Sequence, residues 1–242
     1  MLRYKRIRSN FFTDTFFVTS KGISSRGNKS AQLFISYMGF VAIYPMKSKR
    51  EFSLALKQFC KDVGVPMNLV VDPSGEQTNK NVKYFCHQIG AKLRILEEST
   101  QWTNWADLNI GLFNESLQRD VSESNSPSKL WDYCAERRAI IHNLTPRNLF
   151  QLNGNTPYFG QQGDISNACQ FGWYELCYYR EECNVNFPSQ RRRLGKVLVP
   201  LKTERSEMAQ AILTIDVMVV TRRSVTKLSV SEINIESERI KN

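Results

Sequence analysis

The sequence predicts an α/β fold with a mixed sheet, followed by a small all-β module. Three observations support this prediction. The first fifty residues contain runs of aromatic and β-branched residues joined by short turns. The apolar period then becomes helical, and strand-like and helix-like segments alternate up to residue 144. A Gly-, Asn- and Gln-rich stretch follows, and after it come only short strand-like runs. This order is typical of a sheet that combines hairpins with helical crossovers.

Five strands and four helices are expected in the first part of the chain. The strands are at 11–19, 31–38, 40–46, 67–71 and 92–96, and the helices at 52–63, 76–90, 104–121 and 128–144. The first helix illustrates the reasoning, because Phe52, Leu56, Phe59 and Val63 recur at helical spacing and the pattern ends at Gly64.

The length of 242 residues suits one sizeable core and a small second module. We expect a core at 1–152, a linker at 153–170, an all-β module at 171–230 and a polar tail at 231–242. Membrane-length apolar runs and a secretory signal are both missing from the sequence. The six cysteines form no CxxC pair, so we expect buried, reduced thiols and no zinc site.

Positive charge is concentrated near the start of the chain. The whole chain has 33 Lys and Arg against 23 Asp and Glu, but its first fifty residues hold ten basic residues and one acid. This bias indicates a polyanionic partner, nucleic acid before membrane, although a merely solubilising charge is the alternative. The candidate phosphate contacts are Arg26, Lys29, Lys47, Lys49, Arg50, Arg191, Arg192 and Arg193.

Three aspartates are candidates for chemistry. Asp14 lies mid-strand among phenylalanines, Asp72 follows an apolar strand, and Asp107 falls in the first turn of a long helix. Each has an ordinary alternative: a solvent-facing edge position, an Asx turn before Pro73, or a favourable helix-dipole position. Together they would converge if the two strands are neighbours. Carboxylates that converge in this way can hold two Mg²⁺ ions about 3.5–4 Å apart.

The order and spacing of these acids resemble those of an integrase family. There are 58 residues from Asp14 to Asp72 and 34 residues between Asp72 and Asp107. This resembles the D,D-35-E integrase core of retroviruses and Ty1/copia-type retrotransposons, most closely the copia-like polyproteins of diatoms and similar algae. The matching segments are Phe11–Phe17, Arg26–Lys29, Phe40–Phe52, Val71–Thr78, Trp131–Arg138 and Gly163–Phe171.

The resemblance implies an RNase H-like mixed five-stranded sheet with flanking helices and a barrel-like C-terminal module. It implies that Asp14, Asp72 and Asp107 are catalytic metal ligands for two Mg²⁺ or Mn²⁺ ions, with no zinc in this fragment. The implied partners are element and target DNA and further copies of the chain, without a membrane, in the nucleus. It also implies a piece of a longer polyprotein in which Met1 is internal.

One departure from the family leaves alternatives open. The third family acid is Glu, whereas this chain has Asp107, whose shorter side chain withdraws the carboxylate by about 1 Å and can cost about a hundredfold in rate. The chain is therefore an active integrase core, an inactive relic that binds nucleic acid, or an RNase H-like nuclease. Trp102 and Trp105 flank the site, where they either stack on a splayed base or pack against the helix.

Overall fold

The computed structural model describes residues 4–18, 22–97, 104–162, 171–181, 192–203 and 206–233. The chain divides into two compact units, Met1–Ser166 and Asn167–Asn242, and each is described by itself. No helix in the described ranges combines the length and the apolar character that crossing a membrane requires.

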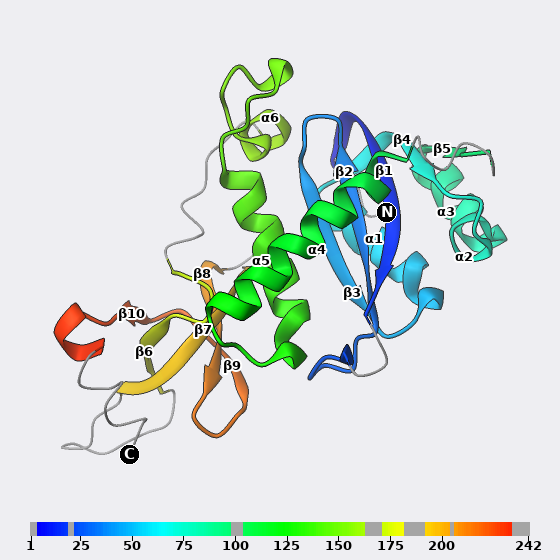
Figure 1. The fold of residues 1–242 in the computed structure, drawn as a ribbon. Coiled ribbons are helices and arrows are strands. Elements are labelled where there is room, and N and C mark those ends of the chain that lie inside the picture. Colours follow the sequence, from blue (N-terminus) through cyan, green and yellow to red (C-terminus); the bar gives the residue numbers. More distant parts are fainter. Residues whose placement is uncertain are drawn as a thin grey trace. The chain divides into compact units, whose positions relative to one another are not determined.

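The first unit is built on a five-stranded mixed sheet (Figure 1). Its strand order is β3-β2-β1-β4-β5, in which β1–β2 and β2–β3 are antiparallel while β1–β4 and β4–β5 are parallel. This arrangement confirms the predicted five-stranded mixed sheet. The strands are β1 (Arg6–Phe17), β2 (Ser30–Ser36), β3 (Val41–Met46), β4 (Val65–Val71) and β5 (Lys92–Ile95).

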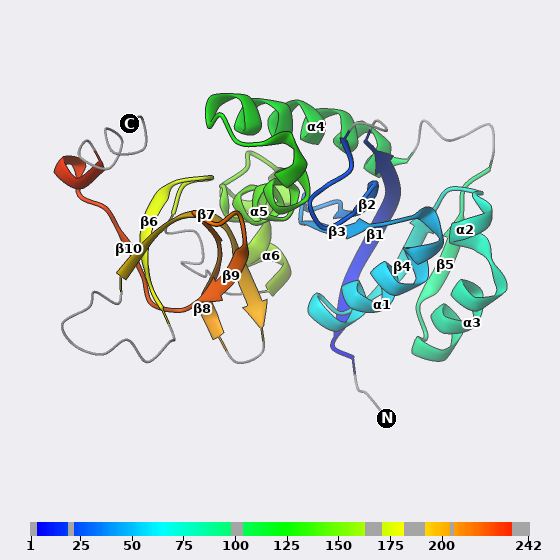
Figure 2. The same ribbon diagram turned by 90° about the horizontal axis from the view of Figure 1, so that it is seen from below.

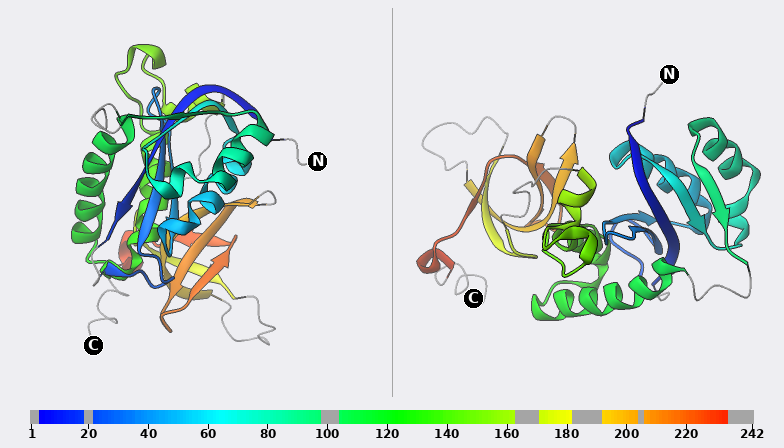
Figure 3. Two further views of the ribbon diagram at one scale, coloured as in Figure 1. Left: turned by 90° about the vertical axis from the view of Figure 1, so that its right-hand side faces the viewer. Right: turned by 90° about the horizontal axis from the view of Figure 1, so that it is seen from above.

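Helices cover both faces of this sheet. Figure 2 and the right-hand view of Figure 3 show α1 and α3 on one face and α4 and α5 on the other. The helices are α1 (Phe52–Asp62), α2 (Gly75–Thr78), α3 (Lys80–Ile89), α4 (Trp105–Glu123), α5 (Trp131–Leu144) and α6 (Pro157–Gln162). Short 3-10 turns, η2 (Lys49–Glu51), η4 (Ser128–Leu130) and η5 (Phe150–Leu152), precede α1, α5 and α6.

Alternation along β1 divides its side chains between the two faces. Phe11 packs against Phe59 of α1, with ring centroids 4.9 Å apart. Phe16 packs against Trp131 of α5, with centroids 6.0 Å apart. Because successive strand residues point to opposite faces, Asp14 shares the face of Phe16, which α4 and α5 cover.

The predicted helix at 76–90 is wrong as a single element. Asn79 has extended backbone angles, and its side chain accepts a hydrogen bond of 2.9 Å from the Val82 amide, so it caps a new helix. An asparagine side chain that bonds the local backbone competes with helix continuation, and this splits the segment into α2 and α3. The first strand also starts five residues before its predicted beginning. Its first residues, Arg6–Asn10, are mostly polar and lack the apolar pattern that predicts a strand. They form a strand because their backbone pairs with β4.

Residues 153–162 lie in the predicted linker, and part of this stretch is the helix α6. Tyr158 of this helix packs against Phe40, with ring centroids 6.4 Å apart. Four of the six cysteines, Cys60, Cys86, Cys134 and Cys177, are buried and unpaired as expected, while Cys169 and Cys183 lie outside the described residues.

The second unit contains an antiparallel sheet of order β10-β6-β7-β8-β9, visible in Figure 3. Its strands are β6 (Leu176–Arg180), β7 (Arg192–Thr203), β8 (Ser206–Thr214), β9 (Val219–Arg222) and β10 (Val225–Lys227). Gly195 is required where β7 meets β8, because a Cβ there would lie 2.5 Å from the Ile212 side chain. The core is formed by Phe171, Cys177, Tyr179, Val197 and Ile212.

Candidate active site

Asp14 and Asp72 lie side by side at one end of the sheet. β1 and β4 are parallel neighbours, and Phe12 pairs with Val70. Two residues further along the chain from each of these lie Asp14, still within β1, and Asp72, which directly follows the end of β4 at Val71. The even step keeps both aspartates on the sheet face of Phe12 and Val70, which is the face of α4 and α5.

Hydrogen bonds from β1 and β2 hold Asp14 in place. The Thr15 amide donates to Asp14 Oδ1 at 2.7 Å. Buried Gln32 of β2 connects the flanking threonines, since its Nε2 donates to Thr13 Oγ1 at 2.7 Å and its Oε1 accepts from Thr15 Oγ1. The backbone that carries Asp14 is therefore fixed on both sides.

Asn104 connects the first turn of α4 to Asp72. Its Oδ1 accepts from the Ala106 amide at 3.1 Å and caps the helix, while its Nδ2 donates to Asp72 Oδ1 at 2.8 Å. Only 1% of Asn104 is exposed. The helix cap therefore also orients the second carboxylate and brings the turn that contains Asp107 beside it.

Sequence reasoning placed the start of the helix near Asn104 but assigned it no part in the site. The available signal was an N-cap residue three positions before a candidate acid. That spacing indicates a helix start but does not say which carboxylate the amide reaches.

The three aspartates are close enough to influence one another. The pKa of Asp14 is raised to about 6, mainly by burial and also by the neighbouring Asp72 and Asp107, against the opposing Thr15 amide and Lys49. Burial and Asp107 also raise the pKa of Asp72, against the hydrogen bond from Asn104. Like charges that are gathered and partly desolvated favour either a proton or a bound cation.

The donor set suits Mg²⁺. Mg²⁺ prefers oxygen ligands and usually takes one or two carboxylates, leaving water and substrate phosphates to complete its shell. Asp14 and Asp72 supply such a pair. Across the described ranges, however, no three His, Cys, Asp or Glu side chains form a ready-made metal group, and Asp107 is exposed. Asp14 and Asp72 therefore fit Mg²⁺, and Asp107 is the weaker ligand.

Basic residues gather at the same end of the sheet. Phe17 pairs with Ser30, which pairs with Met46, so the ends of β1 and β3 and the start of β2 lie together. The predicted phosphate contacts Lys29, Lys47, Lys49 and Arg50 immediately flank these strand ends. Lys49 is near enough to Asp14 to lower its pKa. The carboxylate pair therefore lies beside a cationic surface.

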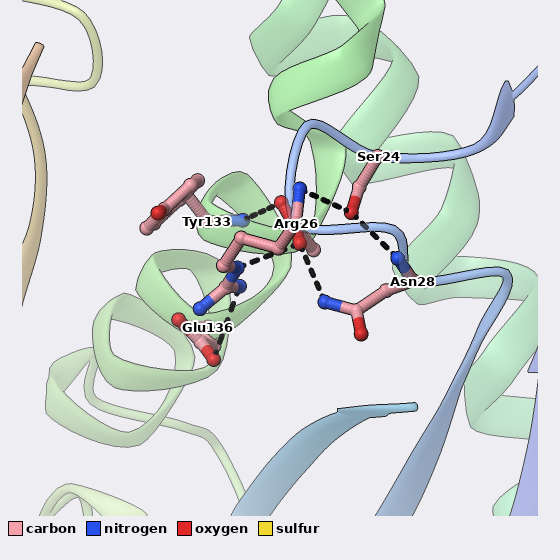
Figure 4. A network of polar contacts seen from close by, with 6 residues as sticks. Ser24, Arg26, Asn28, Tyr133 and Glu136 are labelled. Carbon is pink, nitrogen blue, oxygen red and sulfur yellow. Dashed lines mark hydrogen bonds and ion pairs between the residues drawn. The ribbon is translucent and has the colours of Figure 1, made fainter. Parts of the chain in front are cut away.

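Arg26 lies in a polar network between the β1–β2 loop and α5 (Figure 4). Its Nε donates to Asp132 at 2.7 Å, its Nη2 lies 3.3 Å from Glu136, and its guanidinium carbon lies 3.9 Å from the Tyr133 ring centroid. Asn28 Nδ2 also donates to Asp132, at 2.7 Å. These contacts attach the loop to the helix. They also pair the positive charge of Arg26 with carboxylates of the same unit.

Glu136 makes this network sensitive to pH. Burial raises its pKa from 4.5 to about 7, although Arg26 opposes the rise. The folded state therefore binds the proton more tightly than the unfolded state, so the stability that Glu136 contributes below pH 4.5 is lost as pH rises through 7. Each pKa unit corresponds to about 1.4 kcal/mol.

We expect the free energy of unfolding of Glu136→Gln, measured with denaturant, to fall less between pH 5 and 8 than that of the native chain, because glutamine does not titrate. The exposed residue Glu115 provides the matched control, Glu115→Gln, which should keep the native profile. Identical profiles for the native chain and Glu136→Gln would contradict the assignment.

The remaining candidates belong to the second unit, open α4 or lie outside the described residues. Arg192 and Arg193, predicted as phosphate contacts, begin β7 of the second unit, and Arg193 Nε bonds Glu181 at 2.9 Å. Trp105 opens α4 and is 36% exposed. Arg191 and Trp102 lie outside the described residues.

Comparison with known proteins returned solved structures only. No protein-family model matches the chain, and no curated protein matches it. A chain from a simian T-cell lymphotropic virus intasome matches with 11% identity and a TM-score of 0.48, covering 94% of this chain and 84% of that one.

The HTLV-2 integrase catalytic core domain in complex with magnesium matches in a dimeric and a trimeric form, both at 16% identity. The TM-scores are 0.47 and 0.46, covering 67% and 66% of this chain and all of the other. These structural neighbours are retroviral integrase proteins. At such low similarity, the function must be argued from this chain's own carboxylates and basic surface.

Proposed function

We propose that the chain is the catalytic core of a Ty1/copia-type retrotransposon integrase, which joins element DNA to target DNA by Mg²⁺- or Mn²⁺-dependent transesterification. The observation that carries the proposal is the closeness of Asp14, on β1, to Asp72, which directly follows the parallel neighbour strand β4. The basic residues at the same sheet end and the resemblance of the sequence segments support it.

Each group in the site has a distinct part in this proposal. Bound divalent ions would supply charge stabilisation for the attacking and leaving oxygens of a phosphodiester displacement. Asp14 and Asp72 would hold them, with Asp107 as the third ligand. Thr15 and Asn104 orient the two carboxylates through the hydrogen bonds described above. Lys29, Lys47, Lys49 and Arg50 would hold the DNA backbone.

Strand joining conserves the number of phosphodiester bonds, whereas end processing by water hydrolyses one. A 3′-hydroxyl, or water during end processing, attacks phosphorus and forms the new P–O bond. The bond to the leaving 3′-oxygen breaks, and that oxygen takes up a proton as the attacking hydroxyl loses one. We assign no general base among the side chains, because the described site contains carboxylates suited to ligation.

Several wider features belong to the same proposal. The first unit would carry the chemistry, and Arg192 and Arg193 of the second would add phosphate contacts. The protein would act in the nucleus as a homo-oligomer and would derive from a longer polyprotein.

The alternative is a relic that retains the fold and DNA binding but has lost catalysis. The specific observation in its favour is Asp107, which is exposed and one methylene shorter than the family Glu. A carboxylate withdrawn by about 1 Å contributes poorly to a metal site.

Asp107→Glu tests the proposal and separates it from the relic. We expect the native chain to join short duplex DNA slowly in Mg²⁺ or Mn²⁺, and the variant to be faster by about a hundredfold because the longer side chain restores reach. A silent native chain with an active variant supports the relic. Two silent proteins that both bind DNA would overturn the integrase proposal.

A further inference from the structure

A pocket of about 270 Å³ lies between α4, α5 and the first sheet. Its α4 wall is formed by Asn109, Leu112, Phe113 and Ser116, which recur at helical spacing and therefore share one face of the helix. Asp107 precedes Asn109 by two residues, about 200° around the helix, so its side chain points away from that face. The pocket therefore borders the side of α4 opposite to Asp107 and is separate from the candidate active site.

The floor of the pocket is apolar, whereas two arginines supply positive charge. Leu33, Val41 and Phe113 line the pocket and are each no more than 5% exposed. Arg138 and Arg147 also line it, and both keep exposed surface. Burial and the nearby Arg138 lower the pKa of Arg147, so the two guanidinium groups are near enough to repel each other. An apolar floor beside such a pair suits a ligand that is apolar at one end and anionic at the other.

A neutral side chain holds Arg147 in place. Its Nη2 lies 2.8 Å from His142 Nδ1, and because arginine can only donate, that ring nitrogen is the acceptor. His142 Nε2 then carries the proton and donates to the Gly39 carbonyl at 2.9 Å. The pKa of His142 is lowered to about 4, mainly by burial and also by Arg147 and Arg138, so the ring is neutral at neutral pH. The imidazole therefore orients the guanidinium without neutralising it.

The charge of Arg147 is the one that remains for a ligand. Arg138 Nη1 lies 3.5 Å from Asp120 Oδ1, so that arginine already has a carboxylate partner. None of the described residues that line the pocket is acidic, and within the described part of the chain Arg147 forms no ion pair. A guanidinium presents several donors in a planar fork that matches one carboxylate group. The pocket therefore suits a single carboxylate.

The size of the pocket limits the apolar part of the ligand. An apolar cavity of about 150 Å³ accommodates benzene. A pocket of about 270 Å³ therefore has room for one ring and a short linker that reaches the arginine.

We propose that this pocket binds a small free carboxylate that carries one ring-sized apolar group, with the carboxylate on Arg147 and the ring against the apolar floor. This inference goes beyond the proposed function, because it involves neither the candidate metal ligands nor DNA. Phenylacetate has the required charge, linker and ring, and it serves as the probe.

Ligand-observed NMR on the full chain, without metal or DNA, tests the proposal. Phenylacetate should bind in the millimolar range. Phenylacetamide keeps the ring but lacks the charge, and acetate keeps the charge but lacks the ring. Both should bind about tenfold or more weakly, since the first loses charge-assisted hydrogen bonds and the second loses the burial of a ring.

Two variants and one matched control locate the binding. Arg147→Gln should weaken phenylacetate binding about tenfold or more and remove the preference over phenylacetamide. Ser116→Phe should block binding, because a ring supplied by the protein would fill the pocket. Arg94 is an exposed arginine on β5, at the opposite edge of the sheet from β3, and Arg94→Gln should bind as the native chain does. Denaturant midpoints show which variants keep the native fold, and Arg147→Gln is decisive because Arg147 is exposed and the apolar floor is unchanged.

The outcomes also separate this inference from the proposed function. Equal binding of phenylacetate and phenylacetamide overturns the pocket assignment, and so does native binding by Arg147→Gln. If the peptide acetyl-Gly-Gly-Phe binds about tenfold more tightly than phenylacetate, the pocket takes a peptide carboxyl end and the small-molecule assignment is wrong. DNA joining enters none of these measurements, so a failure here leaves the integrase proposal standing.

Discussion

Asp72→Asn should abolish DNA joining by the protein, a fall of about a thousandfold or more, without disturbing its fold. The substitution removes one negative charge from a site where bound cations would supply several kcal/mol of transition-state stabilisation. It keeps the shape of the side chain. An amide oxygen at position 72 still accepts the hydrogen bond that Asn104 Nδ2 donates to Asp72 at 2.8 Å. Burial also raises the pKa of Asp72, so a neutral side chain there is not costly.

The measurement combines three assays on the same preparation. Joining of labelled duplex ends should be lost, calorimetric binding of Mn²⁺ should weaken, and the denaturant midpoint should match that of the native chain. Glu115→Gln removes an exposed carboxylate further along α4 and should change none of the three. Joining at the native rate by Asp72→Asn would show that the carboxylate pair is not the reaction centre.

The succession of strands and helices along the chain was predictable from local pattern, but the contacts that complete the site were not. Aromatic and β-branched runs followed by a helical period indicate three hairpin strands and then crossovers. That β1 and β4 are neighbours, which brings Asp14 and Asp72 together, is seen only in the structure. The bond from Asn104 to Asp72 depends on where α4 begins relative to β4. No short-range pattern encodes that distance, so the residue was recognised only as a helix start.

Charge counting was similarly limited. The excess of lysine and arginine in the first fifty residues indicates a polyanionic partner, but it does not show which cations are neutralised inside the fold. Arg26 was counted with Lys49 as a phosphate contact. In the structure, Arg26 is paired with Asp132 and Glu136, whereas Lys49 lies at the end of the sheet that carries the aspartates. The two residues have the same formal charge and different surroundings.

Asp132→Ala should produce the largest loss of stability, about 3 kcal/mol in the free energy of unfolding, because the buried partner of a partly buried ion pair is removed. Asp132 has no exposed side-chain surface. Its Oδ2 accepts from both Arg26 Nε and Asn28 Nδ2 at 2.7 Å, and its Oδ1 accepts from the Tyr133 amide at 2.9 Å. Alanine leaves the Arg26 guanidinium and the Asn28 amide without that acceptor.

A double-mutant cycle distinguishes the pair from a general packing defect. The double variant Arg26→Ala, Asp132→Ala should lose less free energy of unfolding than the two single variants together, by about 0.5–3 kcal/mol. The reason is that neither charge is left in the fold without its partner. Asp62→Ala provides the exposed control. It removes a carboxylate that accepts from Gln58 Nε2 at 2.7 Å and from the Tyr44 hydroxyl at 3.2 Å, and should cost about 1 kcal/mol. Strict additivity in the cycle would show that the pair is not coupled.

The same variants decide what Arg26 does for DNA binding. If its charge serves to attach the β1–β2 loop to α5, Arg26→Ala should lower the free energy of unfolding but leave the salt slope of DNA binding unchanged. A phosphate contact would behave in the opposite way, with a shallower slope and native stability. Denaturant unfolding and salt-dependent anisotropy on the single variant therefore separate the two roles. An unchanged slope would leave Lys29, Lys47, Lys49 and Arg50 as the cations that face DNA in this unit.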